Sequence, residues 1–284
     1  MINWLLEKKT NIKKESPSHI LKIESNSRVL FSLFTRYGDT IISAAVIKEF
    51  IEKYRHVECL VICPHQMKPY LDELLPNVKC IGVNKRNLFD LFKIINFLKK
   101  WKPDIGYNPW STGHESCFFL TFCKNFFCYK NFHKPALINH YDVVRLYLNL
   151  EIPKWKIDYT EYKDKLKSVL ICPQSTDENR SMGGHTLDRV ISKIKNNGNS
   201  KITIAAMDRA FSRESYDFFP FMKTSKSSSA FIKCIKKHDI VIAVDSAPLH
   251  IALALKKPIA VFFYTTKESI VINSKASLIN NTFR

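Results

Sequence analysis

Short apolar runs alternate along the chain with longer segments in which apolar residues recur every three or four positions. The first apolar run, 28–34, is followed by a turn at 35–38 and by the segment 39–54, whose apolar residues have helical spacing. The same alternation predicts further strands at 57–62, 78–82, 104–107 and 125–129, and further helices at 66–74, 88–101, 113–123 and 141–150. Strands that alternate with helices at this spacing are typical of a doubly wound parallel sheet.

The helical spacing is lost at 151–166, where charged residues interrupt the apolar stripe, and we interpret this segment as a linker. A second series follows, with strands at 168–172, 201–206, 240–244 and 258–263, helices at 186–196 and 227–237, a loop at 173–185, and a loop with a short helix across 207–219. The pattern predicts an α/β protein with Rossmann-like domains at 28–150 and 167–284. Residues 1–27 precede them as a polar N-terminal extension.

One strand of the second series ends abruptly in a turn that is suited to an anion. The apolar run 240–244 stops at Asp245-Ser246, and small residues at helical spacing follow. In an open parallel sheet, ligands bind outside the carboxyl ends of the strands, and the free N–H groups that open a helix attract negative charge. The sequence therefore predicts that Ser246 and Ala247 bind a phosphate-bearing ligand.

These residues also carry a family resemblance. Asp-Ser-Ala-Pro-x-His at 245–250, followed by Ala-x-Ala-Leu-x-Lys-Pro at 252–258 and an apolar strand, resembles the donor-site signature of the ADP-heptose:lipopolysaccharide heptosyltransferases, glycosyltransferase family 9. Near the other end, the apolar run 28–34 and the sequence Arg-Tyr-Gly-Asp-Thr at 36–40 are similar to that family's first strand and Gly-Asp turn. The resemblance implies the GT-B architecture, in which two Rossmann-like domains face each other across a cleft. It also implies transfer of a sugar, such as heptose from ADP-heptose, onto lipopolysaccharide core or a related cell-envelope glycan.

The resemblance implies that Asp39 is the general base, because the family's proposed base stands at this position. A lone aspartate at the start of a helix is more commonly an N-cap, and this is the structural alternative. By the same resemblance, the residues that bind the donor and its diphosphate are Ser175, Thr176, Arg180, Asp245, Ser246, Ala247 and His250. A guanidinium such as that of Arg180 can neutralise a leaving diphosphate without a metal. A solvated arginine and a packed structural histidine are the alternatives for Arg180 and His250.

The nucleoside side of the donor site is assigned by resemblance alone, to Asp208, Glu214 and Lys226. The chain contains no Asp-x-Asp motif, so we expect neither a metal-bridged diphosphate nor a cofactor. The resemblance implies that the co-substrate is a nucleotide sugar and that its nucleotide is ADP.

Composition adds a strong positive charge, with a net value of +18 over 284 residues. Such a surface favours anionic partners, among which an anionic glycolipid acceptor, the inner membrane face and nucleic acid all qualify. No nucleic-acid-binding motif accompanies the charge, so nucleic acid is not expected to be the partner. No apolar run has the length of a membrane span, and the N-terminal residues 1–9 lack the apolar core of a secretory signal, which predicts a cytoplasmic protein. Trp4-Leu5-Leu6 beside several lysines could contact the cytoplasmic face of the inner membrane, or simply dock on the fold.

Several other functions are disfavoured by motifs that the chain lacks. It has no Gly-x-Gly-x-x-Gly, no P-loop and no Gly-x-Ser-x-Gly, which argues against common dinucleotide oxidoreductases, P-loop enzymes and α/β-hydrolases. A zinc site could be formed by His114, Cys117, Cys123, Cys128 and His133, but their spacing matches no zinc module, and buried reduced thiols fit the cysteines better.

Two departures from the family leave a second function open. Tyr-Thr-Thr-Lys at 264–267 replaces a common Gly-Pro-Thr turn, and the sequence ends at Arg284 where family members continue through more helix. The alternative is therefore a catalytically degenerate protein of the same fold that binds a nucleotide sugar or an anionic glycan.

Overall fold

The computed structural model describes residues 23–84, 87–108, 114–128, 139–154, 158–160, 167–196, 198, 200–273 and 277–279. The chain divides into two compact units, Met1–Ile152 and Pro153–Arg284. Most of the predicted extension 1–27, including Trp4-Leu5-Leu6, lies outside the described residues.

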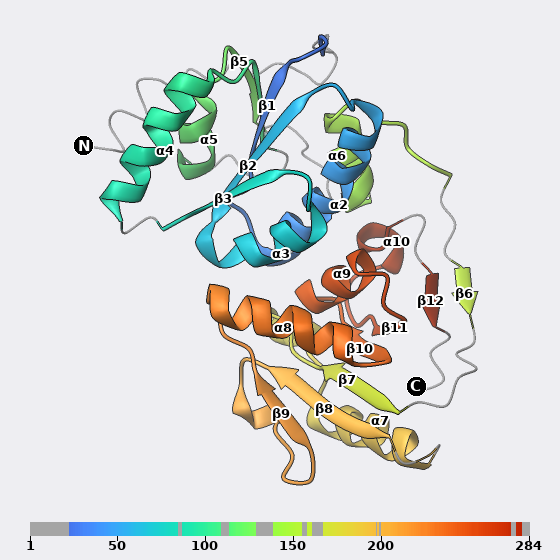
Figure 1. The fold of residues 1–284 in the computed structure, drawn as a ribbon. Coiled ribbons are helices and arrows are strands. Elements are labelled where there is room, and N and C mark those ends of the chain that lie inside the picture. The colour runs from blue at the N-terminus through green and yellow to red at the C-terminus, as the bar shows by residue number, and fades with distance from the viewer. Residues whose placement is uncertain are drawn as a thin grey trace. The chain divides into compact units, whose positions relative to one another are not determined.

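Unit 1 is a five-stranded parallel sheet with helices on both faces (Figure 1). The elements, in chain order, are β1 (Arg28–Ser32), α2 (Tyr37–Lys53), β2 (Glu58–Pro64), the 3-10 turn η1 (His65–Met67), α3 (Lys68–Leu74), β3 (Lys79–Val83), α4 (Leu88–Trp101), β4 (Ile105–Asn108), α5 (His114–Leu120), β5 (Asn125–Cys128) and α6 (His140–Tyr147). The strand order is β3-β2-β1-β4-β5, so the first strand is central.

Local sequence explains why α4 begins and packs where it does. The Asn87 side chain caps the helix, because its Oδ1 accepts hydrogen bonds from the backbone N–H groups of Phe89 at 3.0 Å and Asp90 at 3.3 Å. Ile94 and Leu98, four residues apart, are buried in an apolar cluster with residues of β1, β2 and α5. The helix is therefore held by one apolar stripe, and its opposite face is left to solvent.

A buried ion cluster joins α6 to α2. The guanidinium of Arg145 is fully buried, and it donates two hydrogen bonds to Glu49, from Nε to Oε2 at 2.9 Å and from Nη2 to Oε1 at 2.7 Å. Its Nη1 donates to Oδ1 of Asp142 at 2.7 Å. A buried charge is costly unless it is paired, so these ion pairs hold α6 against α2.

Unit 2 repeats the same topology. Its main sheet has five parallel strands in the order β11-β10-β7-β8-β9, which again places the first strand of the sheet, β7, in the centre. The elements are β6 (Asp158–Thr160), β7 (Ser168–Cys172), η2 (Glu178–Arg180), α7 (Gly184–Asn196), β8 (Lys201–Ala206), η3 (Arg209–Phe211), β9 (Asp217–Pro220), α8 (Ser225–Lys237), β10 (Ile240–Val244), α9 (Ala247–Ala254), β11 (Ile259–Phe262), α10 (Glu268–Val271) and β12 (Ser277–Ile279).

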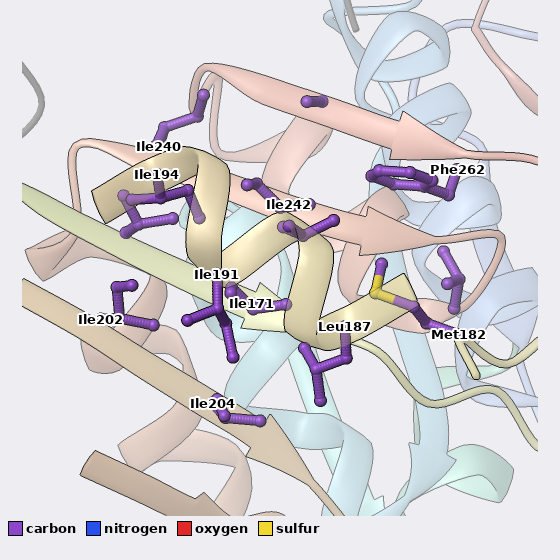
Figure 2. Close-up of a cluster of buried hydrophobic side chains, with 14 of the residues drawn as sticks. Ile171, Met182, Leu187, Ile191, Ile194, Ile202, Ile204, Ile240, Ile242 and Phe262 are labelled. Atoms are coloured by element: carbon purple, nitrogen blue, oxygen red, sulfur yellow. The ribbon is translucent and has the colours of Figure 1, made fainter. Parts of the chain in front are cut away.

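The core on one face of this sheet is almost entirely aliphatic (Figure 2). Leu187, Ile191 and Ile194 of α7 pack against isoleucines of β7, β8 and β10, and Met182 and Phe262 lie at one end of the cluster. All five residues of β10 are buried, as expected for a strand that is covered by helices on both faces. This packing holds the ends of β7 and β10 in place, and the loops that follow these strands start from a rigid base.

The predicted fold class is confirmed for each unit, while some predicted element boundaries are wrong. The segment 207–219 was expected to be a loop with a short helix, but it also contains the start of the edge strand β9. The strand was missed because its residues are only partly buried and lack an apolar alternation. Helix α7 begins at Gly184, two residues before the prediction, and the interpreted linker 151–166 contains the short strand β6, which pairs with β12.

The strand order predicts where each sheet binds ligands. In both units the order reverses beside the central strand, between β1 and β4 and between β7 and β10. Loops that leave two such strands run in opposite directions and open a crevice at the carboxyl edge of the sheet. Within the described parts of the chain, every helix is too short or too polar to cross a lipid bilayer.

Candidate functional site

In unit 2, the topology predicts a ligand crevice between the loops after β7 and β10. The loop after β7 folds back on itself, because Ser175 N–H donates to Ser181 Oγ at 2.9 Å and Met182 N–H donates to the Pro173 carbonyl at 2.7 Å. Ser175 is buried in this loop, whereas Thr176 is exposed. The loop is thus a closed structure with one hydroxyl buried and the next available to solvent.

Arg180 connects this loop to the end of β10. Its Nη1 donates to Oδ2 of Asp245 at 3.1 Å, and its Nε lies 3.4 Å from Oδ2 of Asp177. Asp245 is only 3% exposed, so its carboxylate depends on this cation for compensation. Among the described residues, the buried Nε of Arg180 has no hydrogen-bond partner. A guanidinium held in this way keeps donors available for an anion.

Helix α9 begins at Ala247, two residues after Asp245 of this ion pair. Ser246 is the N-cap residue, but its hydroxyl donates to the Val244 carbonyl at 3.3 Å and does not cap the helix. Ala247 is the first helical residue, so its N–H has no acceptor within the helix. His250 is buried at 4% exposure. The turn therefore offers backbone donors and a positive helix end next to the Asp245 position.

Gln174, which we did not single out in the sequence, joins the loops after β7 and β8. Its Oε1 accepts hydrogen bonds from the N–H groups of Met207 at 2.7 Å and Asp208 at 3.0 Å. Asp208 in turn caps η3, because its Oδ1 accepts from Ala210 N–H at 2.9 Å. The only sequence signal was the position of Gln174 shortly after a predicted strand. The structure thus gives Asp208 a structural role at the edge of the crevice.

The other two residues predicted on the nucleoside side are less closely connected to the site. Glu214 is exposed in the turn before β9, and Lys226 is exposed in the first turn of α8. Helix α8 is capped by Thr224, whose Oγ1 accepts from Ser227 N–H at 3.2 Å. In the described ranges, neither Glu214 nor Lys226 makes a side-chain contact that fixes it to the loop after β7.

In unit 1, Asp39 lies in the first turn of the helix that follows β1, and that helix begins earlier than expected. Helix α2 begins at Tyr37 with Arg36 as the N-cap, so Asp39 is the third helical residue and not a cap. Thr35 Oγ1 donates to Oδ2 of Asp39 at 3.2 Å, and the carboxylate is half-buried. Because the loop after β1 lies at the switch point of this sheet, Asp39 stands at the ligand-binding edge of unit 1.

Titratable groups with shifted pKa values lie mainly in the cores. Burial raises the pKa of the Cys172 thiol at the end of β7 well above its ordinary value, so this thiol stays protonated. Burial lowers the pKa of His238, whose Nδ1 lies 2.7 Å from the Cys234 carbonyl. In the described ranges no group of three or more His, Cys, Asp or Glu side chains is arranged to hold a metal ion.

Comparisons with known proteins relate part of the sequence to one family and the fold to solved structures. Residues 204–281 match the profile of Glycosyltransferase family 9 (heptosyltransferase). A comparison with curated protein sequences finds no match. The structure is similar to that of the glycosyl transferase family 9 from Veillonella parvula DSM 2008, with a TM-score of 0.68, 13% identity, and coverage of 92% of this chain and 88% of that chain.

Two Escherichia coli structures are also similar. Heptosyltransferase WaaC with ADP-2-deoxy-2-fluoro heptose has a TM-score of 0.58 at 13% identity, over 89% of this chain and 92% of that chain. ADP-heptose lps heptosyltransferase II has a TM-score of 0.62 at 10% identity, over 89% and 90%. The predicted resemblance to family 9 is confirmed, the fold is that of GT-B enzymes, and the findings support a glycosyltransferase.

Proposed function

We propose, from the family 9 match of residues 204–281 and from the GT-B type of fold, that the chain is an inverting, metal-independent glycosyltransferase. The donor is a nucleotide sugar, with ADP-heptose as the first candidate, because WaaC of the same fold was solved with an ADP-heptose analogue. The acceptor is lipopolysaccharide core or a related anionic glycolipid of the cell envelope. We place the reaction in the cytoplasm, at the inner membrane face.

The observation that carries this proposal is the anion site of unit 2. Arg180 is held by Asp245 at the switch point, and the N-terminus of α9 follows Asp245 directly. A diphosphate placed there would receive hydrogen bonds from the guanidinium and from the first N–H groups of the helix. The positive charge of the guanidinium and of the helix end would stabilise the negative charge of the leaving diphosphate, so the proposal assigns no role to a metal or a cofactor.

In the proposed mechanism, Asp39 removes the proton from an acceptor hydroxyl. The oxygen attacks the anomeric carbon on the side opposite the diphosphate and forms the new glycosidic bond. The bond between that carbon and the diphosphate oxygen breaks at the same time, and its electron pair leaves with the nucleotide. Arg180 and the α9 N–H groups stabilise the charge that develops on this oxygen. One displacement of this kind inverts the configuration of the sugar.

The surroundings of Asp39 and the overall charge support an anionic acceptor. Arg36, the N-cap of α2, is exposed three residues before Asp39. The net charge of +18 would attract phosphorylated glycans from a distance and raise their association rate. Both observations fit the phosphorylated core of a glycolipid better than a neutral sugar.

The donor site is tested by replacing Arg180 with glutamine. The loss of charge-assisted hydrogen bonds worth about 1.5–3 kcal/mol should weaken ADP-heptose binding by about 10- to 150-fold, as measured by isothermal titration calorimetry. Arg189→Gln, which changes an exposed arginine of α7, should bind the donor like the wild type. Because Arg180→Gln leaves the buried carboxylate of Asp245 without its cation, a thermal melt checks that unit 2 of the variant is still folded. Unchanged affinity in a folded Arg180→Gln protein would remove this arginine from the donor site.

The alternative function is separated from catalysis by a product assay run beside the calorimetry. The sequence Tyr-Thr-Thr-Lys at 264–267 forms a bend after β11, and Tyr264 is 44% exposed there. If this departure from the family has removed turnover, the protein should bind ADP-heptose and yield no glycosylated product from extracted lipopolysaccharide. Binding together with product supports the transferase.

A further inference from the structure

Unit 1 carries an exposed apolar and basic surface on α4, remote in sequence from every residue assigned above. Eight large hydrophobic side chains are exposed among the described residues, and three of them fall within five consecutive positions of this helix. Phe89 is 79% exposed, Phe92 is 64% exposed and Leu88 is 60% exposed. Scattered exposed hydrophobics are ordinary, but such a group at one end of a helix indicates an interaction surface.

Lysines share the face of α4 on which these side chains lie. At about 100° per residue, an arc of about 140° contains three apolar and three basic residues. We call this set the α4 patch: Leu88, Phe89, Phe92, Lys93, Lys99 and Lys100. The only other residue of the helix within the arc is Asn96. The one carboxylate of α4, that of Asp90, falls about 60° outside the arc and is half-buried. The patch therefore combines apolar groups with uncompensated positive charge along its helix.

We infer that the α4 patch docks the protein on an anionic lipid bilayer. Phe89 and Phe92 would enter the boundary between headgroups and acyl chains, while the lysines reach lipid phosphates with their flexible stems. Neither contribution alone gives stable attachment, but an apolar and a basic contribution together do. The choice of a bilayer over a protein partner rests on charge, because the exposed face has three lysines and no carboxylate.

The topology places the apolar end of the patch at a useful edge of unit 1. Helix α4 leads from β3 to β4 in a parallel sheet, so its N-terminal end lies at the carboxyl edge of that sheet. The first turn of α2, which contains Gly38 and Asp39, follows β1 at the same edge. Docking through the α4 patch would bring this edge of the unit toward a membrane that contains the acceptor. This consequence rests on the proposed function, whereas the binding of lipid does not.

Vesicle sedimentation of the full chain tests the inference. The protein should pellet with vesicles of phosphatidylethanolamine and phosphatidylglycerol, and much less with phosphatidylcholine alone. The double variant Phe89→Ser/Phe92→Ser should bind the anionic vesicles at least about tenfold more weakly, because it loses the inserted apolar area. The triple variant Lys93→Gln/Lys99→Gln/Lys100→Gln should lose about fivefold per lysine.

Two matched control variants show whether the loss of binding is specific to the α4 patch or follows from any loss of exposed apolar surface or positive charge. Leu146→Ser/Ile152→Ser removes two other exposed hydrophobics of unit 1, and Lys233→Gln/Lys236→Gln/Lys237→Gln removes three exposed lysines of α8. Both should bind vesicles like the wild type. Undiminished binding of the phenylalanine variant, or equal binding to neutral vesicles, would overturn the inference. A dimer in sedimentation velocity that this variant dissociates would also overturn it, in favour of a second copy. Donor binding should be unaffected in every variant, so failure here leaves the proposed function standing.

Discussion

Replacing Asp39 with alanine should lower the rate of sugar transfer by about 10²- to 10⁴-fold, the range expected when a general base is removed. Donor affinity should stay within a few-fold of the wild type, because Asp39 belongs to unit 1 and the Arg180 anion site belongs to unit 2. The effect should appear in kcat with little change in KM for the donor. Steady-state rates of ADP release with extracted lipopolysaccharide give the measurement.

Asp90 provides a control with the same local geometry. It is the third residue of α4, as Asp39 is the third residue of α2, and both carboxylates lie in the first turn of a helix. Changing either aspartate to alanine removes a favourable interaction with the helix dipole that is worth about 0.3–1 kcal/mol. Asp90→Ala should therefore cost similar stability and leave transfer intact. Full activity of Asp39→Ala, or equal loss in both variants, would remove Asp39 from the chemistry.

Replacing Arg145 with alanine should destabilise unit 1 by about 3–5 kcal/mol, because it leaves the carboxylates of Glu49 and Asp142 without their buried cation. The guanidinium is fully buried, so water cannot replace it without opening the contact between α6 and α2. Urea unfolding followed by circular dichroism measures the loss. Since the two units can unfold separately, the transition of unit 1 must be fitted by itself.

A second arginine, Arg213, shows what a more exposed ion pair contributes by comparison. Arg213 donates from Nε to Oδ1 of Asp188 at 2.8 Å, and Asp188 is largely exposed. Arg213→Ala should cost no more than about 1 kcal/mol. Combining Arg145→Met with Glu49→Gln and Asp142→Asn should recover much of the stability, because no unpaired buried charge remains. If Arg145→Ala were no worse than Arg213→Ala, the ion cluster would not be what fixes α6 against α2.

The alternation of strands and helices could be predicted because the sheets are parallel and covered on both faces. Their strands are short, continuous apolar runs such as 168–172 and 240–244, and the structure has strands β7 and β10 at these positions. Strand β9 could not be found in this way, because it is an edge strand with little buried surface. Periodicity reports burial, so an element that buries little leaves a weak pattern.

The candidate site was predictable where a motif marked it and unpredictable where contacts between loops define it. Asp245 and Ser246 stand directly after a clear strand, and the topology puts that strand at the switch point. The ion pair between Arg180 and Asp245 spans 65 positions of sequence, and no local pattern indicates it. Gln174 was missed for the same reason, since its partners Met207 and Asp208 follow a different strand.

The most direct test of the central claim is a transfer reaction with wild-type protein, ADP-heptose and extracted lipopolysaccharide in the presence of EDTA. We expect ADP to be released and the sugar to be joined to the acceptor with the anomeric configuration opposite to that of the donor, as determined by nuclear magnetic resonance of the product. Retained configuration, or a product that forms only when a divalent metal is restored, would contradict the proposed mechanism. Donor binding with no product under any of these conditions would contradict the assignment as an enzyme.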